Sequence, residues 1–172
     1  MKIIRSMFDK WIEAVSIGIF ALMVLLVTFQ VFVRYVLNSP SAFSETLTRY
    51  LFVWLVLITS TYAFGKRDHM CISYLKDKLP LKGQRMVNIL IEAITFFFAA
   101  AIMIYGGVRI SAMQMVQLDS VLKIPTGLIY SIIPISGVGI AFYSLCNLMT
   151  EYTMLKAVSY THLRAHETLR HL

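Results

Sequence analysis

The chain has 172 residues, of which 58% are hydrophobic and only 15% are charged. Its mean hydropathy of +0.72 excludes a soluble globular protein, because too few polar residues remain to cover a surface that faces water on all sides. The formal net charge of +7 does not indicate a nucleic-acid partner, since the basic residues gather in segments that flank apolar runs, where anionic lipid headgroups attract them. The composition therefore predicts a membrane protein with lipid as its first partner.

Four apolar runs are long enough to cross a bilayer, near residues 12–33, 47–65, 86–108 and 127–150. An α-helix rises about 1.5 Å per residue, so a hydrocarbon core of about 30 Å requires about 20 residues. The runs take up most of the chain and leave no segment that could form a separate soluble core. We therefore predict an all-α polytopic membrane protein with a single four-helix domain over residues 1–155.

The segment at the start of the chain, KIIRSMFDKWIEAV, is amphipathic. Ile4, Met7, Phe8 and Trp11 recur at helical spacing, and basic residues lie opposite them. We expect an interfacial N-terminal helix in the headgroup layer, with Trp11 at the membrane interface. The first run is longer than the apolar part of a signal peptide and no Ala-x-Ala site closes it, so we expect an uncleaved anchor.

A short polar interval separates the first two runs. Arg34 ends the first run beside Tyr35, and Glu45 stands one helical turn before Arg49 at the start of the second. An acid placed before a base suits both an i,i+4 ion pair and the helix dipole. The stretch SPSAFSET is typical of a helix start, and we expect Ser39 to cap it.

Two interpretations of these charges stay open. In the first, Arg34 and Arg49 reach lipid phosphates while Glu45 only braces Arg49. In the second, the three charges mark a docking surface for another protein. The nearby Trp54 favours neither, since aromatic side chains are common both at membrane surfaces and at protein interfaces.

The connection between the second and third runs is strongly basic. Ile72, Leu75 and Leu79 share one helical face there, which predicts a short amphipathic helix that lies on the membrane surface and ends at Pro80. By the positive-inside rule, this loop and both termini face the cytoplasm, and the interval around Arg34 faces outward. We expect lipid headgroups to contact the basic residues of the loop, namely Lys66, Arg67, Lys76 and Lys78.

Few polar residues fall inside the runs. Glu92 lies roughly 10 Å inside the cytoplasmic end of the third run, a depth at which pairing with a neighbouring helix is more common than proton coupling. Pro134 cannot donate a hydrogen bond to the carbonyl of Tyr130, which predicts a kink in the fourth run. Gly137, just beyond it, allows another helix to approach closely.

The sequence lacks the residue patterns of several functional classes. The runs carry no paired histidines that could hold haem, and no catalytic triad, metal cluster or phosphate-binding loop is found. We therefore predict no enzyme activity, no metal and no cofactor. Cys71 and Cys146 fall on the reducing side of the membrane, which argues against a thiol oxidoreductase.

The last residues differ in composition from the rest of the chain. His162 and His166 stand at the i,i+4 spacing of helical metal ligands. However, the stretch SYTHLRAHET resembles translated vector sequence. We therefore expect residues 156–172 to be a non-native or disordered tail.

Several motifs, taken in order, resemble one family. They are Arg34 with Tyr35 at the end of the first run, Glu45 with Arg49 before Trp54, the loop KRDHM leading to LKDKLP, and KIP followed by Pro134 and Gly137. Over residues 5–152 this pattern is similar to the small membrane subunit of tripartite ATP-independent periplasmic (TRAP) transporters, of the DctQ or SiaQ type.

The resemblance implies a bacterial inner-membrane complex of three parts. A periplasmic binding protein delivers an organic acid, a large membrane subunit of M type carries it with sodium through an elevator motion, and the small subunit acts as a scaffold that helps the binding protein dock. The substrates of such systems are carboxylates such as C4-dicarboxylates or sialic acids, and the sialic acid type is the closer likeness. The residues expected at partner contacts are Arg34, Tyr35, Glu45, Arg49, Trp54, His69, Pro134 and Gly137.

Two alternatives stay open beside this interpretation. A small self-assembling four-helix transporter would use Glu92 as its proton-coupling acid. A structural subunit of another complex, such as a respiratory assembly, would share the physics of a scaffold and differ only in its partner. The runs carry no charge at the membrane midplane and a single predicted kink, which favours a scaffold over an independent transporter.

Overall fold

The computed structural model describes the backbone of residues 2–39, 41–66 and 81–168, and the side chains of residues 5–39, 41–66 and 83–155. Within these ranges the regular elements are all helical: α1 Lys2–Val36, α2 Ala42–Lys66, α4 Leu81–Phe98, η1 Ala99–Gly106, α5 Gly107–Met113, α6 Thr126–Tyr130 and α7 Ile132–Thr168. Four stretches are long and apolar enough to cross a membrane, at Arg5–Val36, Ala42–Lys66, Gly83–Met113 and Thr126–Leu155. Each contains one of the four predicted runs, so the predicted fold class is confirmed.

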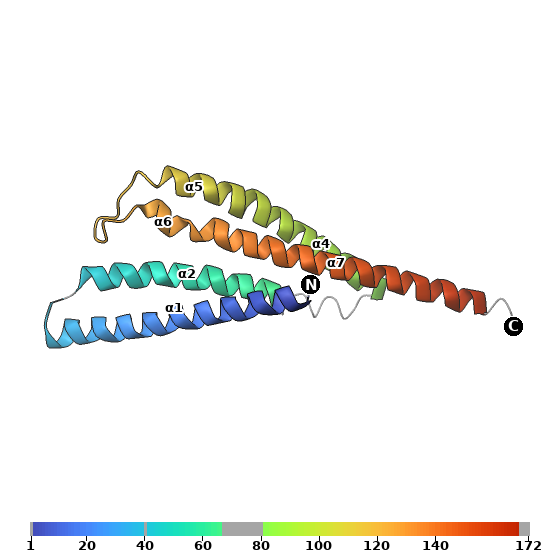
Figure 1. Ribbon diagram of the computed structural model, residues 1–172, viewed down its shortest axis with the longest axis horizontal. Coiled ribbons are helices and arrows are strands. Elements are labelled where there is room, and N and C mark those ends of the chain that lie inside the picture. Colours follow the sequence, from blue (N-terminus) through green and yellow to red (C-terminus); the bar gives the residue numbers. More distant parts are fainter. Residues whose placement is uncertain (1, 40, 67–80, 169–172) are drawn as a thin grey trace.

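The helices form two antiparallel hairpins that lie against each other (Figure 1). α1 packs on α2, α4 and η1 pack on α7, and contacts between α2 and α7 join the hairpins. The start of α1, the end of α2 and the start of α4 lie at one end of the bundle, called here the terminal end, and α7 continues beyond it. The connections 37–41 and 114–125 lie at the opposite end, called here the loop end.

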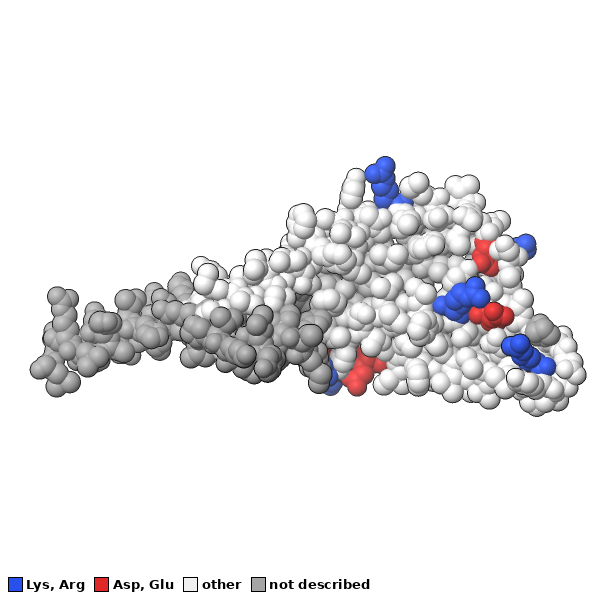
Figure 2. Space-filling model, turned by 180° about the vertical axis from the view of Figure 1, so that it is seen from behind, with Lys and Arg blue, Asp and Glu red and all other residues white. Residues whose placement is uncertain are grey.

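On the face shown in Figure 2, uncharged side chains cover most of the described surface, and most of the charged groups lie toward the loop end. The most apolar stretch of the fourth span is 44% buried inside the chain, whereas that of the first span is 0% buried. α7 is therefore the central helix of the fold. The other spans direct apolar side chains outward, where a bilayer or another membrane protein would cover them.

The N-terminal segment does not form a separate interfacial helix, because α1 runs without a break from Lys2 to Val36. Nothing interrupts it locally, since residues 2–36 contain no proline and one glycine, Gly18. Phe8 packs on the rings of Phe142 and Tyr143, with both pairs of ring centroids 5.6 Å apart. This packing directs the first turns of α1 along α7. The predicted amphipathic helix at residues 72–80 lies outside the described residues.

The third and fourth spans both depart from regular α-helix at the level where they pack together. The third widens into the π-helix η1, whose Ala99 and Met103 are buried against Ile140 of α7. The fourth is interrupted at Ser131, between α6 and α7. This interruption agrees with the predicted kink, because Pro134 has no N–H to donate to the carbonyl of residue 130.

Gly137 of α7 and Gly18 of α1 provide a matched test of this packing. A Cβ atom added at Gly137 would lie 2.7 Å from the Met103 Cβ, whereas one added at Gly18 would meet nothing within 4 Å. Gly137→Ala should lower the free energy of unfolding by about 1–2 kcal/mol because η1 and α7 must separate. Gly18→Ala should leave stability unchanged or raise it, because alanine favours helix.

Thermal unfolding of the purified variants in detergent measures the difference. An unchanged or higher unfolding midpoint for Gly137→Ala would contradict the close packing of η1 on α7.

Candidate functional site

The predicted charge cluster at the loop end is partly assembled. α2 begins at Ala42 rather than at the residue after Ser39, because the Ser41 Oγ accepts a hydrogen bond from the Ser44 N–H at 3.4 Å. One turn later, Arg49 Nη2 lies 3.2 Å from Glu45 Oε1, and both side chains are more than half exposed. An exposed pair of this kind contributes at most about 1 kcal/mol, so it shapes the surface more than it stabilises the fold.

Arg34 and Tyr35 lie exposed in the last turn of α1, at the same end of the molecule as this ion pair. The ion pair that the spacing predicts between Glu45 and Arg49 is thus confirmed. Whether these four residues contact a partner stays a prediction.

Two side chains of α2 bind the second hairpin at the loop end. The Trp54 indole N–H donates to the Ile129 carbonyl at 3.1 Å, and the Tyr50 hydroxyl donates to the Asp119 carboxylate. Asp119 also accepts from the backbone N–H groups of Val121 and Leu122, at 2.9 and 2.7 Å. The indole N–H of Trp54, which was expected at a partner contact, is therefore already satisfied within the chain.

These hydrogen bonds stabilise the ionised form of Asp119. The Tyr50 hydroxyl, followed by the N–H groups of Leu122 and Val121, holds the pKa of the Asp119 carboxyl below its usual value. The hydrogen bonds that the carboxylate accepts from the loop are therefore present at neutral pH. They are lost only as the pH falls through the lowered pKa and the carboxyl is protonated.

The structure also contains a buried polar cluster at the terminal end that the sequence analysis did not predict. Arg5 of α1 donates to Asn147 Oδ1 of α7 at 3.1 Å and to the carbonyl of Gly65 at the end of α2. The Tyr143 hydroxyl of α7 donates to Asp9 of α1. One cluster thus ties α1, α2 and α7 together through groups that would otherwise be desolvated without partners.

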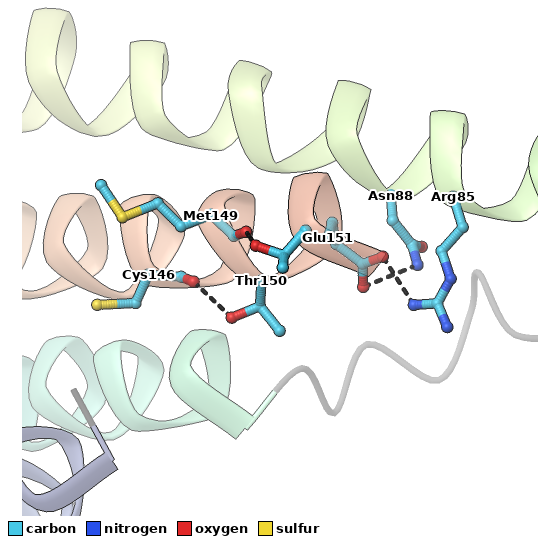
Figure 3. A network of polar contacts seen from close by, with 7 residues as sticks. Arg85, Asn88, Cys146, Met149, Thr150 and Glu151 are labelled. Carbon is cyan, nitrogen blue, oxygen red and sulfur yellow. Dashed lines mark hydrogen bonds and ion pairs between the residues drawn. The ribbon is translucent and has the colours of Figure 1, made fainter. Parts of the chain in front are cut away.

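A second part of the cluster ties α4 to α7. Glu151, whose side chain is 1% exposed, accepts from Arg85 Nη1 at 2.8 Å and from Asn88 Nδ2 at 3.3 Å. Figure 3 shows both α4 side chains pointing toward this carboxylate from the neighbouring helix. Deeper along the same helices, the Ser144 hydroxyl contacts the Glu92 carboxylate at 2.9 Å. The prediction that Glu92 pairs with a neighbouring helix is confirmed.

A signal for this cluster is present in the sequence. Tyr143, Asn147 and Glu151 recur at i,i+4 spacing along the fourth run, so they form one polar stripe on an otherwise apolar helix. Polar residues that face a bilayer are costly, so a stripe of them predicts a buried face. The partners Arg5 and Arg85 come from segments whose positive charge was attributed to lipid headgroups alone.

The remaining predicted residues fall into three groups. Pro134 and Gly137 make their close contacts inside the chain, against Gly107 and Met103. Trp11 is exposed, and the Lys66 ammonium lies 4.4 Å from the centroid of the Tyr62 ring. Four residues lie outside the described part of the chain: Arg67, His69, Lys76 and Lys78.

Removing one partner of the buried ion pair tests the cluster. Arg85→Met leaves Glu151 buried without its cation, and this should lower the free energy of unfolding by about 3–5 kcal/mol. The double change of both residues to methionine should recover most of that loss, because no charge then remains buried. Arg49→Met, which breaks an exposed pair, should cost no more than about 1 kcal/mol.

Unfolding of the four proteins in the same detergent provides the measurement. Equal losses for Arg85→Met and Arg49→Met would show that the pair at Glu151 has no special role in the fold.

Comparison with known proteins places this arrangement in a family. Residues 23–154 match the family described as tripartite ATP-independent periplasmic transporters, DctQ component, which is a component of transporters and not of enzymes. A Haemophilus influenzae chain provisionally named a TRAP transporter small permease protein is 28% identical, over 80% of this chain and 85% of its own length.

Two further relatives carry names that include a substrate. The sialic acid TRAP transporter small permease protein SiaQ of Vibrio cholerae is 26% identical, over 92% of this chain and 91% of its own length. The sialic acid TRAP transporter permease protein SiaT of Haemophilus influenzae is 24% identical over 83% of this chain, but the match covers only 22% of that longer protein. Because the family match covers most of the chain, from the second half of the first membrane-spanning helix to the end of the fourth, this protein belongs to the DctQ family of TRAP transporter components.

Proposed function

We propose that this chain is a scaffold for the large membrane subunit of a TRAP transporter, and that it helps a periplasmic binding protein dock for sodium-driven uptake of an organic acid. The observation that carries the proposal is that polar side chains inside the spans contact other helices of the same chain. The polar side chains inside the described spans that reach across the bundle hold one helix of this chain to another. In the described spans these side chains therefore serve helix packing, which favours a scaffold over a solute path.

The broken helices of the third and fourth spans do not provide a solute path either. A cavity of about 450 Å³ lies beside η1 and the interruption at Ser131, where a transporter would place its binding site. Its lining is dominated by aliphatic side chains such as Leu57, Ile102, Met103 and Ile133. Its polar groups are the hydroxyls of Tyr50, Thr126 and Tyr130, and among the described residues no cation lines it that could pair with the charge of an organic acid.

The outer surfaces of the helices support contact with a larger membrane protein. α1 exposes large side chains along most of its length, among them Phe20, Leu25, Phe29 and Phe32. Lipid chains cover such a surface, and so does another bundle of helices. The match to part of the longer SiaT permease favours the second, because in that relative a region similar to this chain is joined to additional sequence in one polypeptide.

The proposed orientation follows from charge. The terminal end and the described helix ends beside it carry Arg5, Lys10, Lys66 and Arg85, so we assign this end to the cytoplasm of a bacterium with the protein in its inner membrane. The loop end then faces the periplasm. Residues 1–155 form the functional domain in this proposal, and the family match ends at residue 154.

The proposed substrate is a sialic acid, or otherwise a C4-dicarboxylate. Two relatives named for sialic acid support the first, although in neither is the identity above 26%. Because we assign no solute contact to this subunit, its sequence bears on the substrate only through the partners that it assembles.

Reversing the charge at Arg49 tests the docking role. Arg49→Glu places two acids one turn apart at the exposed start of α2, and uptake by the assembled transporter should fall by at least tenfold at low binding-protein concentration. Arg49→Lys should retain most of the uptake, because the positive charge remains. The measurement is accumulation of labelled substrate in vesicles that contain equal amounts of assembled complex. Undiminished uptake by Arg49→Glu would remove the docking role.

The second candidate function, a self-assembling proton-coupled transporter, rests on Glu92. Its contact with the Ser144 hydroxyl suits a structural role, because the hydroxyl holds the carboxylate toward α7. Glu92→Gln should therefore leave uptake by the complete transporter within about twofold, since an amide oxygen accepts the same hydrogen bond. The wild-type chain alone in vesicles should move no solute. Proton-driven flux by the isolated chain that is lost in Glu92→Gln would favour this second candidate instead.

A further inference from the structure

The connection between α5 and α6 presents apolar side chains to the outside at the loop end. Val116 is 91% exposed and Met113 is 72% exposed, and Leu118 and Met115 are also exposed. These residues lie at or beyond the limits of the spans, because the third span ends at Met113 and the fourth begins at Thr126. We call these four side chains the apolar tip. Exposed apolar side chains that cluster outside a bilayer indicate a binding surface.

The backbone that carries the apolar tip is well ordered by hydrogen bonds. The Thr126 N–H donates to the Gln117 carbonyl at 2.8 Å, and the Gly127 N–H donates to the Gln114 carbonyl at 3.0 Å. Further along the same connection, the Asp119 N–H donates to the Ile124 carbonyl at 2.9 Å. The tip is therefore held in place before any partner arrives, which lowers the entropy cost of binding.

Tyr50 connects this ordered loop to the first hairpin. Its hydroxyl donates to the Asp119 carboxylate, which in turn accepts from the N–H groups of Val121 and Leu122. Tyr50 immediately follows Arg49 in α2. The apolar tip and the exposed charges at the start of α2 are thereby held as one surface, which we call the docking face.

The composition of the loop favours a protein partner over insertion into lipid. Residues 112–125 contain no Trp, Tyr or Phe, the side chains that anchor segments at the headgroup level. Gln114, Gln117 and Asp119 alternate with the apolar residues, so the loop has no continuous apolar side to bury in a bilayer. Methionines, by contrast, adapt well to the surface of a protein partner.

The charges around the tip indicate the electrostatic character of that partner. Arg109 stands one turn before Met113, and Lys123 lies in the same loop. Arg34 and Arg49 add two more exposed cations at this end. Arg49 and Glu45 pair with each other and Tyr50 holds the Asp119 carboxylate, so Arg34, Arg109 and Lys123 leave positive charge in excess at this end. A complementary surface would be acidic.

We propose that the apolar tip inserts into an apolar pocket with an acidic rim on the soluble binding protein. The inference rests on the proposed function, because it assigns this loop as the main anchor of the docking that Arg49 assists. Binding surfaces concentrate their affinity in a few side chains that leave water on contact. Val116 and Met115 take that role here, and the cations around them steer the approach.

The test uses the complete transporter in vesicles with added binding protein. Met115→Gln together with Val116→Asn keeps side-chain size and charge while removing apolar character. The concentration of binding protein that gives half-maximal uptake should rise at least tenfold, and maximal uptake should stay within twofold. Ser120→Asn, a polar change at an exposed position of the same loop, should shift the half-maximal concentration by less than twofold.

Two results would overturn the inference, and only the second would also overturn the proposed function. If Arg49→Glu raises the half-maximal concentration but the Met115 and Val116 double variant does not, docking stands and the tip is not its anchor. If uptake does not depend on the binding protein at all, the proposed function itself fails.

A fluorophore on the tip distinguishes contact with the binding protein from insertion into lipid. It is attached at Val116→Cys in a chain that also carries Cys71→Ser and Cys146→Ser. Its emission should shift to shorter wavelength only when binding protein is added. Quenching by brominated lipids in vesicles without binding protein would instead place the tip in the membrane and overturn the inference.

Discussion

The cost of leaving a polar group without a partner in a bilayer determines how this chain folds. α7 carries Tyr143, Asn147 and Glu151 on one stripe, and their placement toward lipid would cost several kcal/mol for each group. The fold avoids that cost by making α7 the central helix, with α1 and α2 on one side of the stripe and α4 on the other. The apolar faces of the outer helices then remain directed toward the bilayer.

Much of this fold is predictable because its signals are local. The four spans follow from length and hydropathy, the ion pair between Glu45 and Arg49 follows from spacing, and the interruption before Pro134 follows from the missing N–H. Each of these needs only residues within a few turns of one another.

The polar cluster is less predictable because its partners are far apart in sequence. Arg5 and Asn147 are separated by 142 positions, so neither indicates the other until the hairpins are joined. The π-helix is a similar case. Residues 99–106, AAAIMIYG, carry no local signal for a wider turn, and the close packing of Met103 on Gly137 depends on the neighbouring helix. From the sequence alone, the positive charges of Arg5 and Arg85 are explained equally well by attraction to lipid headgroups. The structure shows instead that they contact Asn147 and Glu151.

Side-chain hydrogen bonds join the two hairpins at both ends of the bundle, and this suits the proposed role. At the terminal end the hairpins share the contacts of Arg5 and of Tyr143, with Gly65 packed directly beneath the Tyr143 ring. At the loop end, side-chain hydrogen bonds from Tyr50 and Trp54 join α2 to the second hairpin. An apolar cavity of about 250 Å³ lies beside these two residues. The proposed scaffold must keep its helices in register, and these bonds do so at both ends, so the apolar tip would meet a partner as a preformed surface.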